Sequence, residues 1–595
     1  MPIYKAPLRD MRFVLYELHG GEAMTELPGF EDFGRDLVEP VLDEAAKLCE
    51  QVLFPLNRSG DEEGCTLANG VVSTPKGFKE AYDRFRDGGW TSISCDPAWG
   101  GQGFPNVVST LVEEMICSAN LSFGMYPGLS HGAYNALARH GTEALKEKWL
   151  PKLVAGEWAG TMCLTEPHCG TDLGLIRTRA EPKDDGSWAV TGTKIFISAG
   201  DHDLTDNILH LVLARTPGAP KGIKGISLFL VPKYAVGDDG AVGGPNGVTC
   251  GSIEHKMGIK ASSTCVMNFD GATGWLIGER HKGMRAMFTM MNTARLGVAI
   301  QGLGIAEVSY QNAVAYARDR IQGRSLSGTK APDKAADPIL VHPDVRRMLL
   351  TQRAYTEGCR ALAAGIAREL DVSQRHPDPK VRQAAEDYVA LMTPIAKAMM
   401  TDLGSEVANL GVQVYGGHGF IREWGQEQYV RDARITQIYE GTNGVQALDL
   451  VGRKMPADAG RALRRFFHPV QAFIEAKVED ERLGVFVQPL AKAFVRLQQA
   501  TAQVARAGLA RPDEAGAAAT DYLKLFGLTA LAHQWARMAE VAYARLDADG
   551  PDTFYEAKIA TARFFMDRLL PESSARFSAV MAGGRSIMEF PDDAF

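Results

Sequence analysis

The sequence predicts a mainly α-helical protein with a central β-domain. Apolar residues recur at helical spacing over 32–153 and again from Gly283 onward, whereas between these regions the apolar period changes to two. At 595 residues the chain exceeds what one hydrophobic core usually serves, so several packed domains are expected. We expect an N-terminal arm over 1–35, a helical domain over 36–159, a β-domain over 160–278, a helical bundle over 279–454 and an additional helical domain over 455–595.

Composition and charge narrow the class of protein. Hydrophobic residues make up 45% and charged residues 23% of the chain, as in an ordinary soluble globular protein. The net charge of -8 comes without long single-sign runs, and no apolar stretch approaches the ~18 residues of a membrane span. The segment MPIYKAPLRD lacks the apolar core of a secretory signal, and the nine cysteines show neither C-x-x-C nor metal-ligand spacing with histidines. We therefore expect a cytoplasmic protein with reduced thiols, no metal, no nucleic-acid partner and no membrane span.

The first region is helical and the second is a set of short strands. Apolar residues stand three and four apart in FGRDLVEPVLDEAAKLCEQVLF and EALKEKWLPKLVAGE, with a Gly and Pro cluster, WGGQGFP, between them. From Gly160 the alternating segments SWAVTGTKIFIS, NILHLVLAR, GISLFLVP and TCVMNFD are each bounded by Gly, Pro, Asn or Asp. Because no long helical segment separates them, we expect a small antiparallel sheet or barrel that ends near Gly278.

The last part of the chain predicts a helical bundle and a helical extension. Small residues are abundant in ARLGVAIQGLGIAEVSYQNAVAYARDR, so this long helix is expected to pack closely against neighbours. Further helices are predicted over 343–370, 380–410 and from Val445, with an exposed excursion over 323–337. After Lys454 each helix carries one apolar face, so the extension should dock against itself or another subunit.

Glu440 is the candidate general base. It follows the apolar Ile438 and Tyr439 and precedes the turn GTNG, which places its carboxylate on a turn rather than on a solvated helix face. Apolar neighbours partly desolvate such a group and raise its pKa from the ordinary ~4.3 toward values suited to taking a proton at neutral pH. The alternative is structural: Glu440 would lie in the first turn of a helix capped by Thr442 or Asn443 and interact with the helix dipole.

Three further segments offer groups to a ligand. The loop over 162–171, MCLTEPHCGT, presents hydroxyls and backbone amides suited to a ring edge or a phosphate, although its Pro and Gly alone would organise a plain turn. Phe196 offers a flat wall beside the hydroxyl of Ser198, unless it is a core residue. Gly416 and Gly417 permit either close backbone approach or a tight helix end. The segment GLGIAE lacks the third glycine of a dinucleotide fingerprint and lies inside a helical pattern.

The blocks CLTEPHCGTD, KIFISAG, ARDRIQGR, QVYGGHGF and QIYEGTNG, in this order and at these separations, resemble the acyl-CoA dehydrogenase family of flavoproteins. The match covers roughly 32–453. The segment APLRDMRFVLYEL and the helical extension resemble the larger bacterial branch that includes 3-methylmercaptopropionyl-CoA dehydrogenase. The resemblance implies an acyl-CoA dehydrogenase-like fold with a helical domain, a β-barrel-like domain and a four-helix bundle, plus the C-terminal helical extension. It also implies FAD, held between the β-domain and the bundle.

The resemblance assigns flavin contacts in the β-domain. Its flavin-edge segment corresponds to the loop over 162–171, with Thr165 and Thr171 as the expected side-chain contacts. The aromatic wall and its hydroxyl correspond to Phe196 and Ser198, and many members have Trp where this chain has Phe196. The expected contacts in the β-domain are Met162, Leu164, Thr165, Gly170, Thr171, Phe196 and Ser198.

Further cofactor contacts are implied in the bundle. They are Arg320, Gln322, Gln413, Gly416, Gly417 and Thr442. The first two match positions that reach the FAD pyrophosphate of a neighbouring subunit, and the next three match the returning contact. The last lies beside the base, and Gly444 stands where some members carry Gln. By likeness to the family we expect a homodimer, in which the extension covers the surface that tetramers use.

The implied reaction is the FAD-dependent α,β-dehydrogenation of an acyl-CoA thioester to the trans-2-enoyl-CoA. In the family, the carboxylate corresponding to Glu440 removes the α-proton while flavin N5 accepts the β-hydride. The backbone amide of that Glu and a ribityl hydroxyl bind the thioester carbonyl, and electrons pass to an electron-transfer flavoprotein. Asn292 and Arg295 match positions that contact the CoA moiety, although Arg295 can equally form an ordinary salt bridge. Thr171 and Gly441 are also expected at the substrate.

Two other functions fit parts of the sequence. An acyl-CoA oxidase shares the flavin and the base but passes electrons to oxygen, and such enzymes often end in a peroxisomal address, whereas this sequence ends PDDAF. A flavin-bearing relative that binds nucleic acid would need a basic C-terminal region. After Lys454, 17 Lys and Arg stand against 18 Asp and Glu, which disfavours that function. The sequence leaves the acyl group open.

Overall fold

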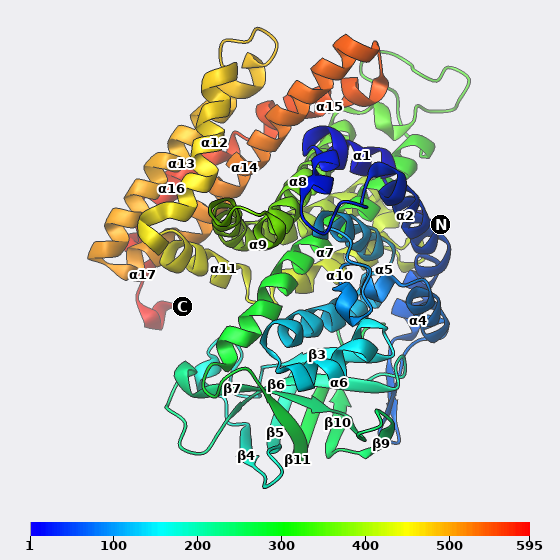
Figure 1. Cartoon of the computed structure of the whole chain (residues 1–595). Helices are drawn as coiled ribbons and strands as arrows, with labels where there is room; N and C mark the ends of the chain where they lie inside the picture. Colours follow the sequence, from blue (N-terminus) through cyan, green and yellow to red (C-terminus); the bar gives the residue numbers. More distant parts are fainter. Residues whose placement is uncertain (1) are drawn as a thin grey trace. The chain divides into compact units, whose positions relative to one another are not determined.

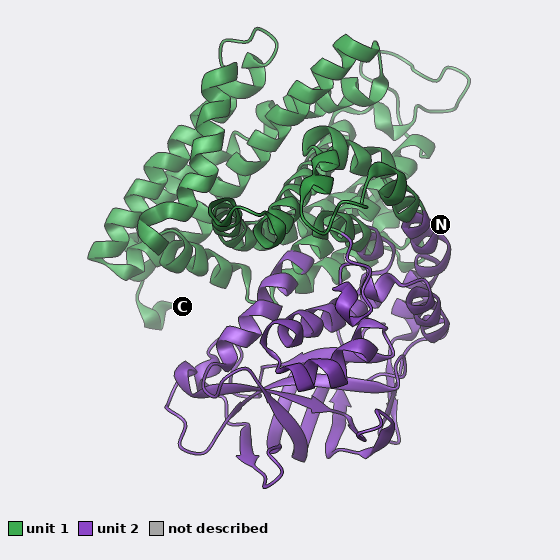
Figure 2. Cartoon of the chain, viewed as in Figure 1, with its two compact units in different colours: residues 1–43, 105–114, 298–595 green, residues 44–104, 115–297 purple. Residues whose placement is uncertain are grey.

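The computed structural model describes residues 2–595, which form two compact units (Figure 2). Unit 1 comprises Met1–Asp43, Pro105–Glu114 and Val298–Phe595, and unit 2 comprises Glu44–Phe104 and Met115–Gly297. The helices that contribute to both units are α2 (Arg35–Leu48), α5 (Asn106–His140) and α7 (Gly283–Asp319). The fold class is as predicted, because helices precede and follow one set of strands along the chain (Figure 1).

The helical part of unit 2 contains a hairpin that the sequence pattern did not predict. Its helices include α3 (Pro55–Glu63), α4 (Phe78–Asp87) and α6 (Glu143–Val154). Between the first two, β1 (Thr66–Ala68) pairs antiparallel with β2 (Val71–Ser73). The connecting residues Asn69 and Gly70 have φ of 53° and 76°, the left-handed pair that a two-residue hairpin turn requires. The Asn-Gly dipeptide between two apolar runs was the available signal.

The β-domain of unit 2 is a sheet that closes on itself. Its strands are β3 (Trp158–Cys163), β4 (Arg179–Pro182), β5 (Trp188–Ser198), β6 (Asn207–Arg215), β7 (Ile226–Pro232), β10 (Val248–Ile253) and β11 (Thr264–Ile277), with a separate pair of β8 (Tyr234–Val236) and β9 (Val242–Pro245). Pairing runs from β6 through β7, β11, β5 and β4 back to β6, which makes the domain barrel-like, as predicted. Most strand pairs are antiparallel, as expected, but β3 and β4 pair parallel to β6. The segment between β3 and β6 is long enough for a crossover.

Strands β6 and β7 are buried along almost their whole length, which explains their unbroken apolar sequences. Leu211 and Leu230 belong to a core cluster that also contains Trp149 of α6. Val212 and Phe229, one residue away in each strand, belong to a second cluster on the other side of the sheet. Because successive side chains point to opposite faces, both faces of these strands need apolar residues.

The bundle of unit 1 contains the C-terminal part of α7 together with α8 (Pro343–Arg375), α9 (Pro379–Tyr415), α10 (Gln426–Arg434) and α11 (Asn443–Asp449). Helices α7 and α9 cross at glycines. A Cβ atom on Gly302 would lie 2.5 Å from the Met400 carbonyl oxygen, and one on Gly404 would lie 2.5 Å from the Gly302 carbonyl oxygen. The segment GLGIAE is therefore a helix crossing, which confirms both the close packing of this helix and the rejection of a dinucleotide fingerprint.

The predicted excursion over 323–337 is largely exposed but is organised by one buried carboxylate. Asp337 accepts hydrogen bonds from the backbone N–H groups of Ser325, Lys330 and Ala331 at 2.9, 3.0 and 2.7 Å. These backbone bonds, the first of them the largest cause, lower the pKa of Asp337 to about 2. The loop is thus an ordered structure despite its composition.

The C-terminal extension packs on itself and on the bundle within unit 1. Its main helices are α12 (Arg461–Lys477), α13 (Gly484–Ala510), α14 (Pro512–Asp549), α15 (Thr553–Phe564) and α16 (Glu572–Met581). Trp535 of α14 is fully buried, and its indole N–H donates to the Ala354 carbonyl of α8 at 3.1 Å. A Cβ on Gly358 would lie 2.8 Å from the same indole nitrogen. Of the two predicted docking modes, the structure shows the one within the chain.

A group of buried charges, the Arg360 cluster, joins the N-terminal arm, the bundle and the extension. It consists of Arg360 and Lys558 with Asp10, Glu114, Glu307 and Glu357. Arg360 of α8 is 1% exposed and lies 2.5 Å from Asp10, Glu114 and Glu307. Lys558 of α15 is fully buried and pairs with Asp10 of α1 (Leu8–Arg12) and with Glu357. Burial raises the pKa of Glu114 to about 7 despite Arg360.

We expect the protein to lose stability in mild acid because several histidines are buried in the neutral form. Burial lowers the pKa to about 4 for His131 and to about 3 for His19, His202, His210 and His533, from 6.5. In the unfolded chain these histidines take up protons below about pH 6.5. In the folded chain they take up protons only near pH 4 for His131 and near pH 3 for the others. This stability is therefore complete above pH 6.5 and is lost as the pH falls toward 4 and 3. Each histidine accounts for at most about 1.4 kcal/mol per pH unit.

Urea unfolding near neutral pH and at about pH 5 measures this effect. Burial raises the pKa of Glu113 and Glu114 to about 7 and that of Asp371 to about 6, so these three carboxyls oppose the histidines. Burial also raises the pKa of Asp201, Glu369 and Glu406. Because the pKa of all five histidines falls far below 6.5, we expect their contribution to dominate and the unfolding midpoint to be lower in acid. An equal or higher midpoint at the lower pH would contradict the expectation.

Candidate functional site

Glu440 lies on a left-handed turn just before a helix. Its φ is 56°, and that of Gly441 is 83°. Helix α11 begins at Asn443, and the N-cap Thr442 accepts a hydrogen bond from the Val445 backbone N–H at 3.3 Å. The structural alternative is therefore right about Thr442 as a cap. It is wrong about Glu440, which is half-buried and lies outside the first helical turn.

Buried side chains hold this turn. A left-handed conformation at a residue with a Cβ costs roughly 1–2 kcal/mol, so neighbouring contacts must maintain it. Gln446 Nε2 donates to the carbonyls of Glu440 and Gly441 at 3.0 and 3.2 Å, and Lys397 Nζ donates to the Gly441 carbonyl at 2.9 Å. Both side chains are fully buried. Sequence reasoning missed both residues, although a lysine inside the apolar run TPIAKAMM was a signal.

Phe196 is presented at the surface of unit 2. It stands near the end of β5 with a φ of 57° and is 60% exposed, so it is not a core residue. Ser198, two residues later, is half-buried, and Ala199 again has a positive φ, 51°. Large aromatic rings bury well in cores, so an exposed ring held by a left-handed backbone is a candidate platform for a ligand.

The loop over 162–171 carries exposed and partly buried groups in the same unit. Gly170 and Thr171 are exposed, whereas Met162, Leu164 and Thr165 are partly buried. The alternative of a plain turn is partly right, because the backbone N–H of residue 166 donates to the carbonyl of 169 at 2.9 Å and the reverse bond is 3.0 Å.

A buried ion pair underlies this loop. Glu166 accepts from Lys194 Nζ at 2.8 Å and from the Thr178 hydroxyl at 2.6 Å, and Lys194 also donates to the Leu164 carbonyl at 2.9 Å. Burial alone would raise the pKa of Glu166, but Lys194 and the hydrogen bonds outweigh it and lower the pKa. The turn is thus fixed by an ion pair that the sequence did not reveal.

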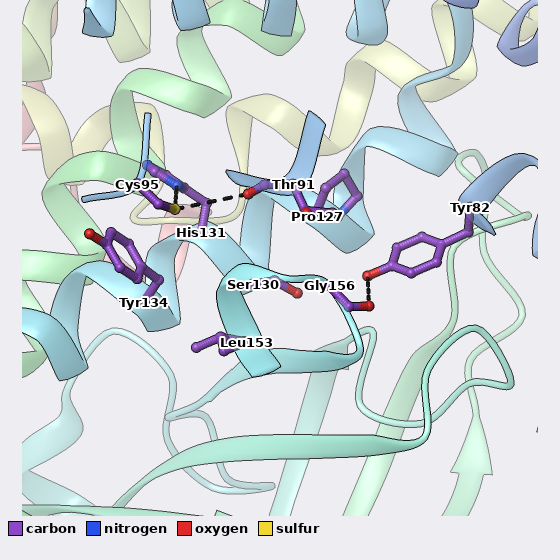
Figure 3. A pocket seen from close by; sticks show the side chains of 9 residues that line it. All are labelled: Tyr82, Thr91, Cys95, Pro127, Ser130, His131, Tyr134, Leu153 and Gly156. Carbon is purple, nitrogen blue, oxygen red and sulfur yellow. Dashed lines mark hydrogen bonds between the residues drawn. The ribbon is translucent and has the colours of Figure 1, made fainter. Parts of the chain in front are cut away.

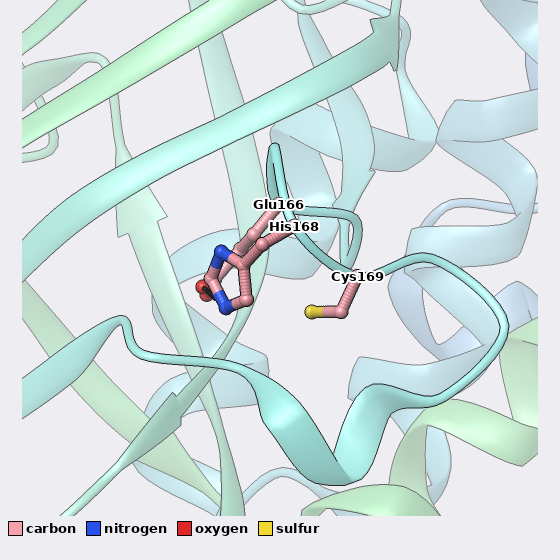
Figure 4. Close-up of side chains that lie close together, drawn as sticks. All are labelled: Glu166, His168 and Cys169. Carbon is pink, nitrogen blue, oxygen red and sulfur yellow. Dashed lines mark ion pairs between the residues drawn. The ribbon is translucent and has the colours of Figure 1, made fainter.

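The same loop brings three groups of metal-binding type together. One carboxylate oxygen of Glu166, one ring nitrogen of His168 and the Cys169 sulfur all lie within 4.8 Å of one another (Figure 4). The Glu166 carboxylate is already bonded to the ammonium group of Lys194, whose charge disfavours a second cation there. We therefore propose no metal at this position.

A cavity in unit 2 is too small for an acyl group. Its volume of about 10 Å³ accommodates roughly one water molecule. Its lining is about equally polar and apolar and comprises Tyr82, Thr91, Cys95, Pro127, Ser130, His131, Tyr134, Leu153 and Gly156 (Figure 3). Burial lowers the pKa of His131 to about 4, so its ring is neutral near pH 7.

The cofactor contacts predicted near the ends of α7 and α9 lie at the surface of unit 1. All five, Arg320, Gln322, Gln413, Gly416 and Gly417, are exposed. The ends of α7 and α9 that carry them meet through aromatic residues, since Tyr316 stacks on Tyr415 with ring centroids 4.1 Å apart. The Tyr316 hydroxyl also lies 2.8 Å from His418 Nδ1. The structure therefore brings these two predicted segments together.

The predicted CoA contacts lie on the N-terminal part of α7, in unit 2. Asn292 is exposed and Arg295 is 4% exposed. Their assignment to the CoA moiety stays a prediction.

Family models of the acyl-CoA dehydrogenases match consecutive parts of this chain. The N-terminal domain matches 39–157, the middle domain 161–272 and the C-terminal domain 281–455. A model described as acetyl-CoA dehydrogenase C-terminal like matches 466–591. The chain is 44% identical over 590 residues to 3-methylmercaptopropionyl-CoA dehydrogenase of Ruegeria pomeroyi, covering 98% of this chain and 99% of the relative. The chain belongs to the acyl-CoA dehydrogenase family.

Two further comparisons extend over the whole chain. It is 35% identical over 618 residues to the broad-specificity linear acyl-CoA dehydrogenase FadE5 of Mycobacterium tuberculosis, with 100% of both chains covered. A solved structure of Caenorhabditis elegans ACDH-11 in complex with C11-CoA superposes with a TM-score of 0.78 at 20% identity, covering 99% of this chain and 95% of that one. The latter likeness shows the shared fold, including a C-terminal extension.

The comparisons confirm the predicted family, fold and enzyme class. Acyl-CoA dehydrogenases are FAD-dependent oxidoreductases, and this chain is one of them. Among residues 2–595 every helix is too short or too polar to span a bilayer. The homodimer, the cytoplasmic location, the domain boundaries and the individual site residues stay predictions.

Proposed function

We propose that this enzyme oxidises an acyl-CoA thioester to the trans-2-enoyl-CoA, with Glu440 as the base. The main support for the proposal is the position of Glu440 on a left-handed turn whose carbonyls accept hydrogen bonds from the buried side chains of Lys397 and Gln446. The chain is also 44% identical over 98% of its length to a dehydrogenase of a CoA thioester. A carboxylate held in a costly conformation indicates a functional demand on its direction.

The residues of unit 2 fit the flavin ring of FAD. Phe196 offers an exposed flat surface, Ser198 a hydroxyl beside it, and Gly170 and Thr171 exposed polar groups on a rigid loop. The residues that we propose to hold FAD are Met162, Leu164, Thr165, Gly170, Thr171, Phe196, Ser198, Arg320, Gln322, Gln413, Gly416, Gly417 and Thr442. By likeness to the family, some of these contacts cross the boundary of a homodimer.

The chemistry requires a base and a stabiliser of negative charge. An α-hydrogen of a thioester is a very weak acid, so its removal needs stabilisation of the developing enolate. The Glu440 carboxylate takes the α-proton as the α C–H bond breaks. The backbone N–H of Glu440 donates a hydrogen bond to the carbonyl oxygen of the thioester. The β-hydride leaves with its electron pair, and the α,β double bond forms. When bound, FAD supplies the hydride acceptor, and an electron-transfer flavoprotein is the proposed partner that receives the electrons.

The relatives suggest the acyl group. The Ruegeria relative is named for 3-methylmercaptopropionyl-CoA and the Mycobacterium relative for linear acyl-CoA of broad specificity. Because identity is higher to the first, 44% against 35%, we propose a short acyl-CoA, with the sulfur-containing thioester first. Asn292, Arg295, Thr171 and Gly441 are the proposed substrate contacts.

Anaerobic bleaching of the flavin absorbance by a panel of acyl-CoA thioesters tests this function. We expect short straight-chain and 3-methylmercaptopropionyl thioesters to bleach the flavin faster than long or branched ones. Reoxidation by an electron-transfer flavoprotein that is faster than reoxidation in air supports a dehydrogenase, and the reverse order indicates an oxidase. A purified protein that stays colourless with FAD, or that no thioester bleaches, would refute the proposal.

A further inference from the structure

We propose that Lys397 and Gln446 are positioning residues that set the direction of the Glu440 carboxylate by holding the carbonyls of its turn. This inference rests on the proposed function, because it assigns a role to the support of the proposed base. Neither residue is among the contacts predicted for substrate or cofactor. Gln446 acts through the carbonyls of Glu440 and Gly441, and Lys397 acts through that of Gly441. All four residues belong to unit 1.

The backbone carbonyls of the turn are the groups through which neighbouring side chains fix its conformation. Glu440 and Gly441 are consecutive left-handed residues, with φ of 56° and 83°. The peptide between Glu440 and Gly441 sets ψ of Glu440, and the peptide between Gly441 and Thr442 sets ψ of Gly441. A rotation of either peptide would change the path of the turn and the position of the Glu440 side chain. Gln446 Nε2 donates to both carbonyls, at 3.0 and 3.2 Å, and thereby resists rotation of both peptides. A Cβ atom on Gly441 would lie only 2.7 Å from Gln446 Nε2, so the Gln446 side-chain amide packs directly against the turn.

Lys397 joins the turn to the middle of α9. Its ammonium group donates to the Gly441 carbonyl and to Asn443 Oδ1, both at 2.9 Å. Asn443 in turn donates to Asp402 Oδ1 at 2.7 Å and to the Ala398 carbonyl at 3.1 Å. Helix α9 is the long helix that crosses α7 at glycines, so the turn is tied to a rigid element of the bundle.

Lys397 carries a positive charge, which Gln446 lacks. The other charged groups in the network of the turn are Asp402, which accepts from Asn443 at 2.7 Å, and Lys524, which lies 3.5 Å from Asp402. Lys397 is fully buried, and its ammonium lies 2.9 Å from the carbonyl of the residue that follows Glu440. A nearby positive charge in a poorly solvated environment favours the ionised form of a carboxylate. The base must be ionised to take a proton. The two positioning residues therefore differ in one measurable property, the pH dependence of turnover.

The variants Lys397→Met and Gln446→Leu test the proposal. For both we expect kcat to fall about 10- to 100-fold, because a small misplacement of a reacting group is costly, while KM changes by less than about 3-fold. For Lys397→Met we also expect the acid limb of the kcat profile to move to higher pH. For Gln446→Leu we expect the limb to stay in place. Both should still bind FAD, which its absorbance reports.

Lys558→Met is the matched control for loss of a buried ammonium. Lys558 pairs with Asp10 and Glu357 in the Arg360 cluster, so this variant should lose thermal stability while its kcat profile stays in place at a permissive temperature. Wild-type kcat and pH profile in both Lys397→Met and Gln446→Leu would overturn the proposal. If Lys397→Met does not fold, Gln446→Leu alone decides, and wild-type kcat in it refutes the role. Full activity in Glu440→Gln would instead refute the proposed function itself.

Discussion

Substitution of Glu440 by Gln is expected to reduce acyl-CoA dehydrogenation by at least about 10³-fold, near the upper part of the range for loss of a general base. Gln has the same shape but cannot accept the α-proton. The turn is held through backbone carbonyls by Gln446 and Lys397, so it should survive the change. Steady-state turnover measures the loss, while flavin absorbance and thermal unfolding report the retained cofactor and fold.

Glu479→Gln is the matched control for this variant. Glu479 is an exposed residue at the C-terminal end of the α12 region, and the same chemical change there should leave turnover unaffected. An active Glu440→Gln enzyme would show that another group removes the proton. A variant that loses FAD along with activity would show that Glu440 acts on the cofactor site rather than as a base.

Substitution of Arg360 by Met is expected to destabilise the protein by about 3–5 kcal/mol, the range for removing one partner from a buried ion pair. The change would leave Asp10, Glu114 and Glu307 without the guanidinium that lies 2.5 Å from each of them. Because these carboxylates come from α1, α5 and α7, the loss should loosen the N-terminal arm together with the bundle. Denaturant unfolding and limited proteolysis of the arm measure the effect.

The control for Arg360 lies on the same helix. Arg347 pairs with Asp344 at 2.8 Å, but the two side chains are 54% and 71% exposed, so Arg347→Met should cost less than about 1 kcal/mol. In Arg360→Met/Glu114→Met we expect part of the stability to return, because one uncompensated carboxylate is removed as well. Equal stability of Arg360→Met and Arg347→Met would contradict the importance of the cluster.

Much of the architecture follows from local sequence signals. The period of apolar residues predicted the long helices α7, α8 and α9, and α7 begins at the predicted Gly283. Alternation predicted the strands, and regular spacing without intervening helices predicted the barrel. The parallel pairing of β3 with β6 could not be predicted in the same way, because it depends on which strands meet after a long connection.

The candidate site likewise contains residues that local sequence predicts and residues that only the tertiary structure reveals. Glu440 was predicted from its apolar neighbours and the glycine turn that follows it, and Phe196 from its place beside Ser198 and from the resemblance to the family. Lys397 and Lys194 were missed, since each contacts residues some 30 to 44 positions away in the chain. A buried lysine reads as an ordinary solvated charge until its partners are known. Its function is a property of the tertiary structure.

The central claim is that the side chain at position 440 removes the α-proton in the step that reduces the flavin. The most direct test is the rate of anaerobic flavin bleaching after rapid mixing with an acyl-CoA deuterated at the α-carbon. We expect a slower rate than with the unlabelled thioester in the wild-type enzyme, and no bleaching on the same timescale in Glu440→Gln. Equal rates for the two thioesters, together with wild-type bleaching in Glu440→Gln, would contradict it.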